Sequence, residues 1–110
     1  MSTLSTHVLD LSRGVPAAGV AVRLFAGETL LHAGVTDADG RCPGLRELSL
    51  ATGRYRLEFA VADYFRGQGV ILPEPPFVDV VPVAFGLADA GHYHVPLLVS
   101  PFGYSTYRGS

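Results

Sequence analysis

The sequence predicts an all-β fold, a sandwich or barrel of about eight short strands. Apolar and polar residues alternate in several stretches, which is typical of strands with one buried face. Turn segments rich in glycine, proline and aspartate separate these stretches at short intervals. No helical periodicity persists long enough to predict a large helix. The length of 110 residues suits one domain, so we expect a single domain over residues 1–110.

The first half of the chain contains four expected strands. The second of these places Val20, Val22 and Leu24 on one face, as a half-buried strand requires. The segment "DADGR" at residues 37–41 predicts a turn, because glycine readily adopts a positive φ. The expected strands cover residues 6–12, 20–26, 29–36 and 54–61.

The second half contains three more strands and the one segment expected to be helical, residues 62–69. Pro82 lies within an expected strand and lacks a backbone donor, which favours an edge strand or a bulge. A short stretch at residues 45–48 is less regular. The expected strands cover residues 77–85, 92–100 and 103–109.

Composition excludes several functional classes. The chain is 48% hydrophobic, with a mean hydropathy of +0.30, so it can form a core. Its formal net charge of −2 argues against binding nucleic acid or an anionic membrane. No apolar run is long enough to span a membrane.

The cysteine content bears on cellular location. Cys42 is the single cysteine, which excludes an internal disulfide and fits a reducing compartment. With no secretory signal visible, we expect a cytoplasmic protein.

Histidines are the main candidates for chemistry. His92 and His94 are two residues apart in an expected strand, so they share a face. With His7 they could form a three-histidine zinc site, but the H-x-H signal is weak and an acid–base role fits better. His7 interrupts what reads as the apolar side of the first strand. The alternative for each is a structural histidine held by a hydrogen bond, which is the interpretation we adopt for His32.

Other polar groups have ordinary explanations by default. Arg41 and Arg108 read as solvated charges, and Tyr104 and Tyr107 as sandwich or interface residues. The chain has neither a serine hydrolase elbow nor a glycine-rich phosphate loop.

Three separated blocks resemble a known family. "HYHVPLLVSPFGYSTYRGS" at residues 92–110 is similar to the C-terminal signature of the 5-hydroxyisourate hydrolases, which are transthyretin-related enzymes of purine catabolism. "STHVLDLSRGVPAAGVAVRLF" at residues 5–25 and "TDADGRCPGL" at residues 36–45 resemble two further family blocks. The resemblance therefore covers nearly the whole chain.

This resemblance implies a transthyretin-like sandwich of two four-stranded sheets with one short helix. It also implies a homotetramer with active sites at the dimer–dimer interface. The activity would be hydrolytic ring opening of the small molecule 5-hydroxyisourate to 2-oxo-4-hydroxy-4-carboxy-5-ureidoimidazoline, on the route from urate to allantoin. The family uses no metal and no organic cofactor, so none is expected here.

Carried over by motif, the family's catalytic residues fall on His7, Arg41, His94 and Ser110. Substrate binding falls on His7, Arg41, Tyr107 and Ser110. By the same resemblance, the two histidines would orient and deprotonate water, and the arginine would stabilise the oxyanion. His92 would be a supporting or structural residue.

One region departs from the family pattern, and one alternative function remains. Residues 66–85 form a longer, more proline-rich connection than the family's, and Val78 stands where the family often has proline. The alternative function is a transthyretin-type carrier of a small ligand without catalysis, which would use the same channel. An interaction module without a site would scatter these polar residues over the surface.

Overall fold

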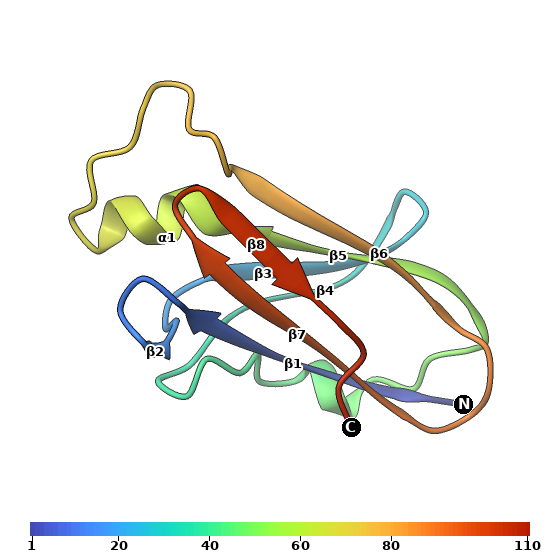
Figure 1. Ribbon diagram of the computed structural model, residues 1–110. Coiled ribbons are helices and arrows are strands. Elements are labelled where there is room, and N and C mark those ends of the chain that lie inside the picture. The colour runs from blue at the N-terminus through green and yellow to red at the C-terminus, as the bar shows by residue number, and fades with distance from the viewer.

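Two four-stranded sheets form the molecule in the computed structural model, which describes residues 1–110 (Figure 1). One sheet has the order β2-β1-β7-β8 and the other β4-β3-β5-β6, which confirms the predicted all-β sandwich with one short helix. The bounds are β1 Thr3–Asp10, β2 Val15–Pro16, β3 Ala21–Ala26, β4 Thr29–Val35, η1 Leu45–Glu47, β5 Gly53–Ala60, α1 Val61–Gly67, β6 Val80–Leu87, β7 His92–Ser100 and β8 Gly103–Thr106. No helix is long and apolar enough to cross a membrane.

The core lies between the two sheets and comes from the alternation that the sequence displays. Val22 and Leu24 of β3 pack with Leu57 of β5 and with Leu97 and Val99 of β7 in one buried cluster. Burying a residue of this size stabilises the fold by about 1.5–3 kcal/mol. Because each sheet buries one face in this cluster, its opposite face points outward and can carry polar side chains.

Most expected elements are present with small shifts in their ends. The strand at residues 92–100 has the predicted bounds, and α1 begins one residue earlier than predicted. The strand expected to begin at residue 77 begins at Val80. Pro82 lies in β6, the edge strand of its sheet, as its missing donor predicts.

The prediction that His7 interrupts the apolar side of the first strand is wrong. The core face of β1 consists of Leu4, Thr6, Val8 and Asp10, all buried, and His7 points to the opposite face. Two polar side chains lie on the core face, so the sequence alone does not reveal which face is buried. Thr6 donates to the Val95 carbonyl over 2.7 Å, and Asp10 accepts from Tyr64 over 2.8 Å. These hydrogen bonds satisfy groups whose burial would otherwise be costly.

A parallel pairing places β1, near the beginning of the chain, beside β7, near its end (Figure 1). In this register Ser5 lies opposite His94, and His7 lies opposite Pro96. The outer face of this sheet therefore carries histidines from both strands.

Candidate active site

The outer face of the β2-β1-β7-β8 sheet gathers the predicted histidines. His7 and His94 are both half-buried, and they lie two residues apart along the paired strands β1 and β7. Side chains on one face of neighbouring strands are close enough to interact. Two of the sequence-predicted groups are therefore diagonal neighbours on one face of the sheet.

Ser5 holds the ring of His94 from one side. Its Oγ lies 2.8 Å from Nδ1 of His94, which leaves Nε2 as the nitrogen available to a ligand. Burial lowers the pKa of His94 below its ordinary value of 6.5, and electrostatic repulsion by Arg41, and by the neighbouring His7, His92 and Arg46, lowers it further. At neutral pH the imidazole is therefore uncharged and can accept a proton.

A tight turn positions Arg41 beside the first strand. The Asp37 carboxylate accepts hydrogen bonds from the backbone amides of Asp39, over 2.9 Å, and Arg41, over 3.1 Å. Gly40 has a φ of +77°, as the Asp-Gly pair predicts. The Val8 amide then donates to the Gly40 carbonyl over 2.8 Å, and a short antiparallel bridge joins His7 to Arg41.

The Arg41 side chain is exposed, and it has no carboxylate partner among the ion pairs of the protein. An unpaired guanidinium keeps its five donors free for a ligand. It borders a cavity of about 240 Å³ together with Ser5 and Arg46, a second arginine without an ion pair. Arg46 was not a predicted site residue, because nothing in the sequence distinguishes it from a surface charge.

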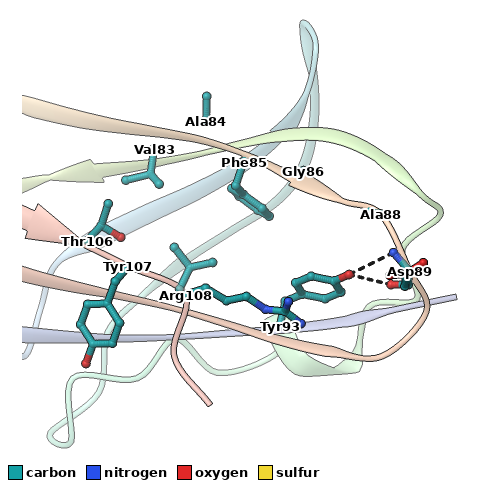
Figure 2. A pocket seen from close by; sticks show the side chains of 11 residues that line it. Val83, Ala84, Phe85, Gly86, Ala88, Asp89, Tyr93, Thr106, Tyr107 and Arg108 are labelled. Atoms are coloured by element: carbon teal, nitrogen blue, oxygen red, sulfur yellow. Dashed lines mark hydrogen bonds between the residues drawn. The ribbon is translucent and has the colours of Figure 1, made fainter.

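The C-terminal tail, residues 107–110, follows β8 and lies along β7. The guanidinium of Arg108 stacks 4.2 Å from the ring centre of Tyr93, and Figure 2 shows the side chain extending toward that ring. Tyr93 is itself fixed, because its hydroxyl donates to the Asp89 carbonyl over 2.8 Å. The next amide, that of Gly109, donates to the His94 carbonyl over 2.8 Å. The end of the chain is thus attached beside a predicted catalytic histidine.

Two predicted residues of the tail are not enclosed by the rest of the chain. The Tyr107 side chain is 59% exposed, and its ring points away from Tyr93 in Figure 2. Ser110, the terminal residue, is also exposed. Beside the tail is a cavity of about 320 Å³ between β6 and β8, whose lining includes Phe85 and Arg108 but neither His7 nor His94.

The hydroxyls of Thr3 and Ser5 were missed by the sequence analysis. Both lie on the histidine face of β1, and both contact ring nitrogens on β7. The alternation T-x-S-x-H at residues 3–7 was the available signal, but it indicates a site only when the partner strand is known. His32 lies on β4 of the other sheet, 3.3 Å from the Pro43 carbonyl, as a structural histidine would.

Ring nitrogens of His92 and His94 contact hydroxyls, and no further ligand-type side chains surround them. No group of three His, Cys, Asp or Glu residues is placed to hold a metal ion. Both ring nitrogens of His92 contact hydroxyls, at 2.7 Å and 2.9 Å.

The sequence profile of the HIUase/Transthyretin family matches residues 4–109. This chain belongs to that family. The match spans most of both histidine strands, the Arg41 turn and the tail through Gly109, which carry all the predicted site residues except Ser110.

Individual members of the family resemble this chain along its whole length. A 5-hydroxyisourate hydrolase of Mesorhizobium japonicum is 54% identical over 97% of this chain and 91% of its own. The structure of Klebsiella pneumoniae 5-hydroxyisourate hydrolase has a TM-score of 0.87 at 39% identity, covering 100% of this chain and 94% of that one. Sea bream transthyretin, solved with thyroxine, has a TM-score of 0.83 at 34% identity, covering 96% and 93%. The family fold thus occurs with different functions, and the side chains of the site must distinguish them.

Proposed function

We infer that this chain is a 5-hydroxyisourate hydrolase that opens the six-membered ring of its substrate with water. The observation that carries this inference is the convergence of His7, His94 and an unpaired Arg41 beside the attached C-terminal tail. Close relatives carry the same activity in their names. A passive binding channel has no need of neighbouring proton-transfer groups, which favours the enzyme over the carrier.

The two histidines activate the attacking water. As water adds to a ring carbonyl carbon, its oxygen forms a bond to that carbon and its proton passes to an imidazole. The carbon–nitrogen bond of the ring then breaks, and the proton is delivered to the departing nitrogen. The product is 2-oxo-4-hydroxy-4-carboxy-5-ureidoimidazoline. The lowered pKa of His94 supports its role as the acceptor, since its ring is neutral at neutral pH.

Arg41 stabilises the charge that develops on the carbonyl oxygen. Its planar guanidinium presents several donors in a fixed fork that suits an oxyanion. Preorganised donors of this kind contribute about 10²–10³-fold to kcat. The turn stabilised by Asp37 supports this role, because it fixes the backbone of Arg41 beside His7.

Tyr107 and Ser110 complete the substrate site when copies of the chain assemble. We expect a homotetramer in which the histidine faces meet across a dimer–dimer interface and enclose the flat substrate. Exposed apolar residues on and beside the open edge strands support such contacts: Val80 is 47% exposed, Phe102 is 63% exposed and Tyr104 is 50% exposed. Sedimentation analysis tests this, since a monomer at assay concentration would contradict it. We expect the assembly in the cytoplasm, where the Cys42 thiol stays reduced.

The decisive experiment mixes the purified protein with freshly generated 5-hydroxyisourate and follows its ultraviolet decay. A hydrolase accelerates the decay in proportion to enzyme concentration and saturates with substrate. A carrier would bind thyroxine in the same channel and leave the decay at its spontaneous rate. An interaction module would do neither.

A further inference from the structure

A third imidazole on the histidine face has no role in the proposed reaction. His92 is exposed and lies two residues before His94 on β7. Its Nδ1 lies 2.7 Å from the Thr3 Oγ1, and its Nε2 lies 2.9 Å from the Ser5 Oγ. The same Ser5 oxygen lies 2.8 Å from Nδ1 of His94. Four side chains therefore form one continuous chain of hydrogen bonds.

The parallel register of β1 and β7 creates this chain. Thr3 lies opposite His92, and Ser5 lies opposite His94. Because alternate residues share a face, the hydroxyls and imidazoles fall in two adjacent rows and can interlock. Shifting the register by one residue would move one row to the core face and remove every contact.

The number of protons restricts how the chain can be arranged. The Ser5 hydroxyl has one hydrogen and contacts two ring nitrogens, so it donates to one and accepts from the other. In one arrangement His94 donates from Nδ1 to Ser5, Ser5 donates to Nε2 of His92, and His92 donates from Nδ1 to Thr3. This leaves a lone pair on Nε2 of His94. The reverse arrangement places a hydrogen on that nitrogen.

We propose that Ser5 and His92 are positioning residues, which fix the proton of His94 on Nδ1 and so keep its Nε2 free to accept a proton from water. This rests on the proposed function, which requires a base at His94. The partner of one ring nitrogen commonly decides which nitrogen of a histidine carries the proton. The fixed Ser5 contact also holds the ring in one orientation.

The surrounding charges keep the chain in its neutral form. Partial desolvation by its neighbours lowers the pKa of His92, although the residue is exposed, and the charge of Arg46 from the segment after the turn lowers it further. Arg41 and Arg46 carry positive charge near His94 and oppose its protonation, and protons on His7 or His92 would oppose it as well. A protonated His92 would donate from both nitrogens. Ser5 would then donate to Nδ1 of His94, and the arrangement would reverse.

Nitrogen-15 NMR of the histidine rings, in the full-length protein without substrate at neutral pH, tests the proton position directly. We expect His94 to carry its proton on Nδ1. In Ser5→Ala, His94 should change to the Nε2-protonated form that histidine prefers in water, and Ser5→Thr should retain the Nδ1 form. A wild-type His94 protonated on Nε2, or a form unchanged by Ser5→Ala, overturns the proposal. This readout needs no turnover, so its failure is distinct from failure of the hydrolase assignment.

Kinetics provide the second readout. Ser5→Ala should lower kcat by about 10–100-fold while KM changes little. Losses of this size follow removal of the hydrogen-bond partner that orients a histidine in metalloenzymes. Ser5→Thr should restore most of the rate, whereas a merely structural serine would not require the hydroxyl. The double variant Ser5→Ala/His92→Ala should lose no more than Ser5→Ala alone. Ser49→Ala, at an exposed serine outside the chain of hydrogen bonds, is the matched control. Full kcat in a folded Ser5→Ala, or additive losses in the double variant, contradicts the proposal.

Discussion

The backbone amide of Gly109 donates a hydrogen bond to the carbonyl of His94 over 2.8 Å, and only a residue without a side chain fits there. A Cβ on Gly109 would lie 2.6 Å from Cδ2 of the His94 ring. The last residues of the chain and a proposed catalytic imidazole are therefore in direct contact. A side chain added at Gly109 must therefore displace either the His94 ring or the tail.

Gly109→Ala should therefore reduce kcat/KM without unfolding the protein. The added methyl group displaces either the ring or the tail, and a shift of about 1 Å in such a group can cost about 10²-fold. Kinetics on fresh substrate, with thermal melting as a check, measure the effect. Gly67→Ala is the control, because a Cβ there meets nothing within 4 Å. Wild-type kcat/KM in Gly109→Ala would show that the tail and the ring are not coupled.

Arg108→Ala should loosen the tail. The stacking of the Arg108 guanidinium on Tyr93 contributes about 0.5–2 kcal/mol as a cation–π contact. Loss of this contact should lower kcat/KM by up to about 30-fold. Tyr93→Phe is an informative comparison, because it keeps the ring under Arg108 and removes only the hydroxyl. We expect it to retain far more kcat/KM than Arg108→Ala. Equal losses in the two variants would mean that the stacking does not hold the tail.

Removing any member of the proposed catalytic set should slow turnover. His94→Ala or His7→Ala should lower kcat by about 10²–10⁴-fold, the usual contribution of a general base, and Arg41→Ala by about 10²–10³-fold. Initial rates of ultraviolet decay measure these losses. His32→Ala, on the other sheet, should keep its kcat. A double variant of His7 and His94 with wild-type turnover would falsify the assignment.

The pH dependence of kcat/KM should follow His94. Because its pKa is lowered in the fold, the acid limb of the profile should have its midpoint below 6.5. The same shift affects stability: between the folded pKa and 6.5 the unfolded chain binds more protons, so the free energy of unfolding falls as the pH falls through that window. NMR titration of the ring measures the pKa directly. Arg41→Met should raise the pKa by removing a positive charge, and Arg41→Lys should leave it lowered. An unchanged pKa in Arg41→Met would show that this charge does not act on the ring.

Gly40→Ala should damage both stability and activity. A Cβ there would lie 2.4 Å from the Val8 carbonyl oxygen and 3.2 Å from Cδ2 of His7, so the turn that carries Arg41 must shift. Gly14→Ala is a matched control, since its φ of +69° is also left-handed but its Cβ meets nothing within 4 Å. Both variants should lose about 1–2 kcal/mol for the left-handed backbone, but only Gly40→Ala should lose additional stability and kcat/KM. Chemical unfolding and kinetics compare them, and equal behaviour would contradict the close packing of this turn.

Local patterns in the sequence determined most of the strands and, except in the first strand, the faces that were predicted. The strand predicted at residues 92–100 has the same ends as β7, and the spacing of two residues placed His92 and His94 on one face. The Asp-Gly pair predicted the turn before Arg41, and Pro82 predicted an edge strand or a bulge, of which the edge strand is present. These features follow from the period of two along a strand and from the φ preferences of single residues, which neighbouring residues alone impose.

The tertiary structure decided which of these pieces meet. The pairing of Ser5 with His94, the bridge from His7 to Arg41 and the contact of Gly109 with His94 all join residues far apart in the chain. It also decided the direction of His7, because Thr6 and Asp10 occupy the core face with their hydrogen bonds satisfied there. Strand partners and register depend on how the whole core packs, and the alternation within one strand is compatible with many partners.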